Sequence, residues 1–201
     1  MEDPISITCH SFNRLAGESL KGEVRPEADS DRDRVEAFLM RTGRPVPKVV
    51  VLGHNLALRC RQVDELGGAA IGVDGGENVV ELAKQRYPGG QFQRGDLRDL
   101  PVETTAFDGV WAGPVMAHIP RAEVAKAMAS VHGVLRPGGL LYVRLPLGDE
   151  EGFEETELGP IYKVRWDPDR FTAAIGALDF QLLESKPFGE DELGMIFRRE
   201  Y

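Results

Sequence analysis

The sequence predicts an α/β protein of three layers, in which a mainly parallel sheet is covered by helices on both faces. Short apolar runs typical of buried strands alternate along the chain with longer stretches whose apolar residues recur at helical spacing. Turns that contain Gly or Pro separate most of these segments. Because each strand is followed by a helix, successive strands are expected to run in the same direction.

The pattern is clearest at residues 49–74. The run VVVL, residues 49–52, is entirely apolar and suits a strand buried on both faces. A helical spacing begins at Leu56 and ends at Gly67, and a second strand over residues 69–73 closes at Asp74. In such a strand–turn–helix–strand unit the turn directs backbone N–H groups at a ligand, and the acidic residue accepts hydrogen bonds from two ribose hydroxyls. The unit therefore predicts a nucleotide-binding half.

The remaining elements follow from the same signals. A single domain is expected, with N-terminal cap helices in residues 1–46 and an α/β core in residues 47–201. Asp29 or Ser30 is the expected cap of the second helix, and the acidic segment 148–159 has the composition of a mobile surface loop. Helices are expected at about residues 11–20, 31–42, 77–87, 121–132 and 168–178, and further strands at 91–94, 107–112, 140–145, 180–185 and 195–199, the LRPGG segment before 140 being a turn.

Composition narrows the class of partner. The 24 basic and 33 acidic residues leave a net charge of −9, without the basic footprint of a nucleic-acid-binding protein. Cys9 and Cys60 are far apart and lack metal-ligand spacing, so two free thiols in a reduced, cytoplasmic setting are expected. No apolar run reaches membrane-spanning length, and the acidic start MEDP does not resemble a signal peptide. We expect a small-molecule substrate, no metal, no nucleic acid and no membrane partner, with the choice between monomer and homodimer open.

Five segments in register carry a family resemblance: VLG, GVD, GDLRDLP, FDGVWAGPVMAHIP and LRPGGLLYVR. With them the chain resembles, from about Phe12 to its C-terminus, the class I S-adenosylmethionine-dependent methyltransferases of the small bacterial type. The resemblance implies a seven-stranded sheet with the last strand antiparallel. It also implies S-adenosylmethionine as cofactor and methyl transfer to a small-molecule acceptor.

The resemblance places the cofactor at the ends of the first four strands. Asp74 corresponds to the residue that binds the ribose diol, and Asp96 to the acidic residue near the adenine amino group. Each has an alternative, because Asp74 is also placed to cap a helix and Asp96 to form a turn. The other expected cofactor contacts are Gly53, His54, Asn55, Gly75, Leu97, Ala112 and Gly113.

The first turn departs from the family pattern D-x-G-x-G-x-G, because this chain has VLGHNLA and keeps only Gly53. Asn55 replaces the second glycine, and Asn tolerates the left-handed conformation or caps the next helix. His54 and Leu56 place bulk beside the expected methionine moiety. Two interpretations remain. Either the adapted turn still binds the cofactor, which we favour, or the fold now serves as a binding or regulatory protein or catalyses another reaction.

His118 is the expected catalytic residue. It follows the fourth strand at the mouth of the expected cleft, and imidazole titrates near neutral pH, as a general base for an oxygen or nitrogen acceptor requires. Its alternative role is a hydrogen-bonded residue that shapes the turn before Pro120.

Overall fold

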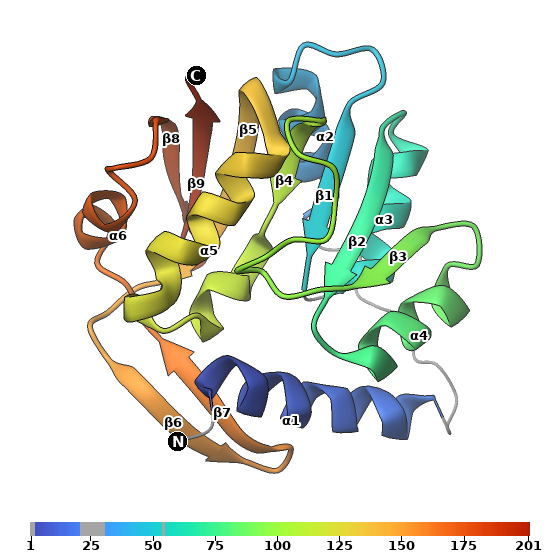
Figure 1. The fold of residues 1–201 in the computed structure, drawn as a ribbon, viewed down its shortest axis with the longest axis vertical. Helices are drawn as coiled ribbons and strands as arrows, with labels where there is room; N and C mark the ends of the chain where they lie inside the picture. The colour runs from blue at the N-terminus through green and yellow to red at the C-terminus, as the bar shows by residue number, and fades with distance from the viewer. Residues whose placement is uncertain (1–2, 21–30, 54) are drawn as a thin grey trace.

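The computed structural model describes residues 3–20, 31–53 and 55–201, which form a sheet covered by helices on both faces (Figure 1). The seven strands of this sheet lie in the order β3-β2-β1-β4-β5-β9-β8. β1 to β5 are parallel, whereas β9 is antiparallel to β5 and to β8. This confirms the predicted fold class. The strands are β1 (Lys48–Leu52), β2 (Ala69–Asp74), β3 (Gln91–Arg94), β4 (Phe107–Trp111), β5 (Leu135–Pro146), β8 (Phe180–Phe188) and β9 (Glu192–Arg199).

The alternation of side chains along β1 explains the layers. Val50 and Leu52 pack on the side of α5 (Arg121–Val134) and α6 (Pro168–Ala174). Val49 and Val51 pack on the side of α2 (Arg32–Arg41) and α3 (Leu56–Glu65), which α4 (Glu77–Arg86) extends. All four valine and leucine side chains are buried, as a strand in the middle of a sheet requires.

Two elements lie outside these layers, at the carboxyl ends of the parallel strands. Helix α1 (Pro4–Ser19) crosses the strand ends and contacts α4 and β7 (Figure 1). Strands β6 (Glu151–Thr156) and β7 (Gly159–Val164) form a separate antiparallel hairpin beside α1. A short 3-10 helix, η1 (Gly113–His118), follows β4 and contacts both β5 and β7.

The prediction of a loop over residues 148–159 was wrong. Half of this segment is β6, whose Phe153 ring packs edge-on against Tyr162 of β7, with 5.0 Å between ring centroids. Two of its carboxylates pair with cations from other elements: Glu151 with Arg121 at 3.0 Å and Glu154 with Lys163 at 2.6 Å. The acidic composition therefore reflects an exposed two-stranded ribbon.

Smaller differences concern element ends. Helix α1 starts at Pro4, because the Asp3 carboxylate accepts the Ile5 N–H and caps it. The LRPGG segment belongs to β5, where a register shift against β4 accommodates it. Helix α6 ends at Ala174, earlier than predicted. The N-cap of α2 is Asp31; the predicted caps Asp29 and Ser30 lie outside the described residues.

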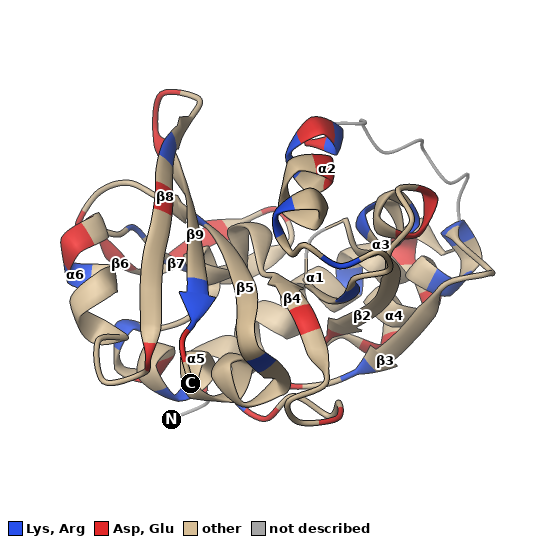
Figure 2. Cartoon of the chain, turned by 90° about the horizontal axis from the view of Figure 1, so that it is seen from above, with Lys and Arg blue, Asp and Glu red and all other residues tan. Residues whose placement is uncertain are grey.

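Basic and acidic side chains are interspersed over the helices and strands (Figure 2). One cluster of charges around the buried Asp108 joins strands: its carboxylate on β4 accepts hydrogen bonds from the Lys48 N–H at 2.8 Å and from Arg44 Nε at 3.1 Å, and also pairs with Arg136. Within the described ranges, no helix combines the length and apolar character needed to cross a membrane.

Candidate functional site

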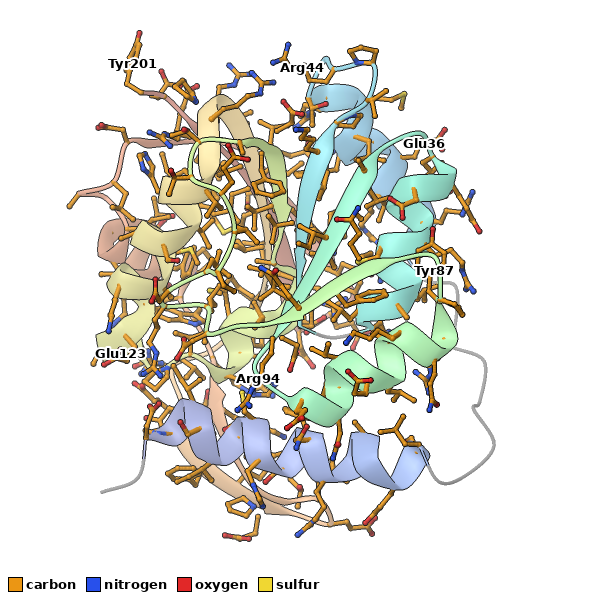
Figure 3. The ribbon with its side chains drawn as sticks, turned by 45° about the vertical axis from the view of Figure 1, so that its right-hand side comes forward. Glu36, Arg44, Tyr87, Arg94, Glu123 and Tyr201 are labelled. Atoms are coloured by element: carbon orange, nitrogen blue, oxygen red, sulfur yellow. The ribbon has the colours of Figure 1, made fainter. Side chains whose placement is uncertain are left out.

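A cavity of about 850 Å³ lies between helix α1, the carboxyl ends of β1 to β3 and the 3-10 helix η1. This size falls within the range of about 300–1,000 Å³ that is usual for small-molecule sites. Figure 3 shows Arg94, which lines the cavity, on the side of the sheet that faces α1. Among the predicted site residues, the cavity is lined by Gly53, Asn55, Asp74, Gly75, Asp96, Leu97 and His118.

Asp74 stands at the end of β2 and faces the first turn. Its Oδ1 accepts the Gly76 N–H at 2.8 Å, while Oδ2 lies 3.9 Å from the position that a Cβ atom on Gly53 would occupy. Burial raises the pKa of Asp74, and the Gly76 hydrogen bond only partly opposes this effect. Helix α4 has Gly76 as its N-cap and receives no side-chain cap from it. Asp74 thus presents one carboxylate oxygen to the cavity.

The altered first turn keeps the backbone shape that glycine would allow. Gly53 has φ +69° and Asn55 has φ +54°, ψ +41°, so Asn55 adopts the left-handed conformation predicted for it. Asn55 is also the N-cap residue of α3, although its side chain makes no capping hydrogen bond. His54 lies outside the described residues. Asn55 therefore adopts, without being glycine, the left-handed conformation at this position of the turn.

The bulk of Leu56 is accommodated by a glycine on the next strand. A Cβ atom on Gly72 of β2 would lie 2.8 Å from Leu56 Cγ and 3.0 Å from Leu56 Cδ1, closer than real contacts allow. Leu56 is 3% exposed and packs in the core between α3 and the sheet. The absence of a side chain at Gly72 gives Leu56 this space, and Leu56 also lines the cavity, as its position in the first turn predicted.

Asp96 and Leu97 follow β3. The Asp96 carboxylate accepts a hydrogen bond from Arg98 Nη2 at 2.6 Å and another from the Arg98 backbone N–H at 2.8 Å. These bonds hold the pKa of Asp96 below its usual range, since they stabilise the ionised form more than burial disfavours it. Asp96 also forms a turn with Asp99, as its alternative role predicted. Leu97 is buried beside it.

Ala112 and Gly113 lie behind the cavity wall. Ala112 is fully buried and does not line the cavity. Gly113, with φ +37°, lines a second cavity of about 40 Å³ together with Asn55, Pro114 and the side chains of Asp31, Arg59, Trp111, Tyr142 and Arg144. Asn55 and Pro114 line both cavities.

Two contacts at the cavity were absent from the sequence predictions. Arg94 Nε donates to the Gly75 carbonyl at 2.9 Å and fixes the turn after Asp74. A Cβ atom on Gly75 would lie 2.9 Å from Cys9 Sγ on α1, so this glycine allows the helix its close approach. Burial, together with Asp74 and Asp96 nearby, raises the pKa of Cys9 to about 11. Cys9 therefore faces the cavity as a neutral thiol at neutral pH.

Helix α1 is anchored on both sides of the cavity. Asn13 Oδ1 accepts the Asn78 N–H of α4 at 2.6 Å. On the hairpin side, Ser11 Oγ donates to the Pro160 carbonyl at 2.9 Å, and the Thr8 hydroxyl accepts the Tyr162 N–H at 2.8 Å. The spacing of polar residues along α1 gives no sign of these partners, because they come from distant parts of the chain.

His118 lies at the end of η1, at the wall of the cavity. Its Nδ1 is 2.9 Å from the Tyr162 carbonyl oxygen, and its ring meets the Phe12 ring of α1 edge-on at 5.2 Å. Because a carbonyl oxygen only accepts hydrogen bonds, Nδ1 carries the proton in the neutral ring and Nε2 is the basic nitrogen. This tautomer suits a residue that takes a proton. In the described part of the chain, no group of three or more His, Cys, Asp or Glu side chains is arranged to hold a metal.

Comparison with known proteins places this architecture. Residues 52–143 match the family model described as a methyltransferase domain. An uncharacterized 37.1 kDa protein of a Streptomyces fradiae transposon is 35% identical over 154 residues, 68% of this chain and 44% of that protein. A demethylmenaquinone methyltransferase of Symbiobacterium thermophilum is 32% identical over 78 residues, 36% of this chain and 30% of that protein. The chain thus spans less than half the length of these two relatives.

Solved structures share the fold across the whole chain. The DhpI–SAH complex superimposes with a TM-score of 0.76 at 20% identity, covering 98% of this chain and 97% of that one. A 1,6-didemethyltoxoflavin-N1-methyltransferase of Burkholderia thailandensis, with S-adenosylhomocysteine bound, gives a TM-score of 0.72 at 18% identity and covers 100% of this chain and 92% of that one. Together with the strand order described above, these similarities show that the chain has the fold of these methyltransferase structures, and that its residues 52–143 resemble the methyltransferase domain family.

Proposed function

We propose that this protein binds S-adenosylmethionine in the cavity beneath α1 and transfers its methyl group to a small-molecule acceptor. The observation that carries the proposal is the arrangement of Asp74 opposite Gly53. A carboxylate oxygen of Asp74 faces the cavity beside Gly53, a turn residue that has no side chain. A half-buried carboxylate with a raised pKa is disfavoured in the free protein, and hydrogen bonds from ligand hydroxyls would compensate for it.

The residues present fit the cofactor in charge and shape. Asp74 would hold the ribose, Leu97 and Asp96 would lie near the adenine, and the turn from Gly53 to Asn55 would meet the amino-acid end. The Arg98 guanidinium contacts both carboxylate oxygens of Asp96, so Asp96 would meet the adenine only through the acceptor positions that Arg98 does not occupy. Gly75 would allow α1 to enclose the sugar. Small-molecule acceptors are favoured by the names of relatives, which include demethylmenaquinone and ubiquinone-biosynthesis methyltransferases.

Methyl transfer requires no covalent intermediate with the protein. When bound, S-adenosylmethionine supplies a methyl group on a positively charged sulfur, which is already a good leaving group. Helix α1 and the strand ends exclude water and hold the acceptor in line with the methyl group, the main source of rate enhancement. His118 Nε2 takes the proton from an oxygen or nitrogen acceptor.

Isothermal titration calorimetry with S-adenosylmethionine and S-adenosylhomocysteine tests cofactor binding. We expect dissociation constants in the micromolar range, or about −8 kcal/mol of binding free energy. Absence of heat at millimolar ligand would favour the alternative of a fold retained for binding or regulation. Release of S-adenosylhomocysteine in the presence of hydroxylated aromatic and amine compounds then tests methyl transfer. Binding without any transfer would favour a different reaction in the same cavity.

We also propose a cytoplasmic location, supported by the two free thiols Cys9 and Cys60.

A further inference from the structure

The unpaired edge of β7 is covered by side chains instead of a third strand. β7 pairs with β6 along one edge. On the other edge the Pro160 carbonyl accepts Ser11 Oγ, the Tyr162 N–H donates to Thr8 Oγ1, and the Tyr162 carbonyl meets His118 Nδ1, at 2.9, 2.8 and 2.9 Å. Backbone groups at an open strand edge need such partners. Both backbone polar groups of Tyr162 are therefore used, the N–H by Thr8 of α1 and the carbonyl by His118.

Thr8 is well placed to control this arrangement. Thr8 is 3% exposed, and its hydroxyl oxygen accepts a hydrogen bond from the Tyr162 N–H. The carbonyl of the same Tyr162 contacts the His118 ring. One helical turn further on, Phe12 contacts the same ring directly. Helix α1 thus reaches His118 twice, once through the Phe12 ring and once through Thr8 and Tyr162.

We propose that Thr8 is a positioning residue for His118. By fixing Tyr162, it aims the Tyr162 carbonyl at Nδ1 and so keeps His118 in the tautomer whose basic nitrogen is Nε2. Thr8 belongs to α1, so the helix that covers the cavity also holds the strand edge that His118 contacts. The inference rests on the proposed function for the role of His118 as a base, but the hydrogen-bond chain itself stands on the structure alone.

The matched pair of variants is Thr8→Val and Ser11→Ala. Valine keeps the size of Thr8 and removes the oxygen that accepts the Tyr162 N–H. Ser11→Ala removes a second hydrogen bond between the same helix and the same strand edge, at a residue that is equally buried (3% exposed) but bonds Pro160 instead of Tyr162. Thr8→Ser keeps the hydroxyl and serves as the conservative rescue.

The measurement is the side-chain nitrogen spectrum of the full-length, ¹⁵N-labelled protein with S-adenosylhomocysteine added, at about pH 8, where imidazole is neutral. His118→Gln identifies the His118 signals among the four histidines. We expect the Nδ1–H tautomer in the unmodified protein, in Ser11→Ala and in Thr8→Ser, and a mixture of tautomers in Thr8→Val. If an acceptor is found, Thr8→Val should lower kcat about three- to tenfold, the effect of one hydrogen bond, and Thr8→Ser should restore it.

Two results would overturn the proposal: an unchanged His118 tautomer in Thr8→Val, or an equal change in Ser11→Ala. If thermal melts show that Thr8→Val does not fold, Thr8→Ala replaces it with the same expectation. The spectrum can be recorded without catalytic activity. The test of whether Thr8 positions His118 therefore remains possible even if the protein transfers no methyl group to any compound tried.

Discussion

Replacing Asp74 by asparagine should weaken cofactor binding without weakening the fold. Asp74 Oδ1 is already engaged by the Gly76 N–H, so Oδ2, the oxygen turned toward Gly53, is the one offered to a ligand. A hydrogen bond to a charged group contributes about 1.5–3 kcal/mol. Its loss corresponds to about a 10- to 150-fold higher dissociation constant for S-adenosylmethionine.

The effect on stability follows from the sign of the pKa shift. Burial raises the pKa of Asp74 above its ordinary value of 3.8, which means that ionisation disfavours the folded state. The free energy of unfolding therefore falls as the pH rises through 3.8 and the raised pKa, and it stays lower at neutral pH. Asparagine keeps an oxygen for the Gly76 N–H but carries no charge. The ligand-free variant should melt at the same temperature or higher, each 1 kcal/mol being worth about 2–4 °C for a chain of this length.

Calorimetric titration and thermal melts of the ligand-free protein, at neutral pH and near pH 3, measure the two effects. Asp99→Asn is the control, because Asp99 is exposed in the neighbouring turn and does not line the cavity. Binding within twofold of the unmodified protein would refute the assignment of Asp74 to the cofactor. A melting temperature lowered by several degrees would refute the argument from burial and identify Asp74 as a structural residue.

Three further predictions concern Gly72 of β2, the proposed base His118 and the charge cluster around Asp108. Gly72→Ala should displace Leu56 and Phe92, since the new Cβ would lie 2.7 Å from Phe92 Cδ1. We expect the free energy of unfolding, measured by denaturant titration, to fall by about 1–3 kcal/mol, and cofactor binding to weaken. Unchanged affinity for the cofactor would show that Leu56 does not border the bound ligand. His118→Gln should lower kcat about 100-fold or more and leave the dissociation constant of S-adenosylmethionine unchanged by calorimetry, and an unchanged kcat would assign His118 to turn structure. Asp108→Asn should lower the free energy of unfolding by about 1–3 kcal/mol at neutral pH, because Asp108 accepts hydrogen bonds from Lys48 N–H and two arginines. Those bonds lower the pKa of Asp108, so its contribution to the free energy of unfolding is present above pH 3.8, its ordinary pKa, and is lost as the pH falls through the lowered pKa. Equal stability of the variant and the unmodified protein at pH 7 would contradict this prediction.

The elements that the sequence predicted best are those with a local signal. The all-apolar run that became β1 and the stop at Gly67 after α3 needed no knowledge of distant contacts. The hairpin β6–β7 was missed because its stability depends on Tyr162 and Arg121, which meet Phe153 and Glu151 only in the folded chain. A run of glutamates by itself is typical of a loop.

The same division applies to the candidate site. Gly53, Asn55 and Asp74 were identified because turn geometry and strand ends are encoded within a few residues of each other. The pairing of Asp96 with Arg98 could not be predicted, because Arg98 has several acidic neighbours in the folded chain and the sequence does not say which of them it contacts. The contact of His118 with the Tyr162 carbonyl joins residues 44 positions apart and leaves no trace in the local pattern.

The two ends of the described chain lie on opposite sides of the molecule, and this matters for anything joined to them (Figure 1). Asp3 pairs with Arg98 at 2.7 Å, and Ile5 and Ser6, just after it, border the ligand cavity. Tyr201 is 84% exposed at the far end, beyond β9. An affinity tag or fused module placed before Asp3 would thus begin beside this cavity, whereas one placed after Tyr201 would begin on the opposite side of the molecule.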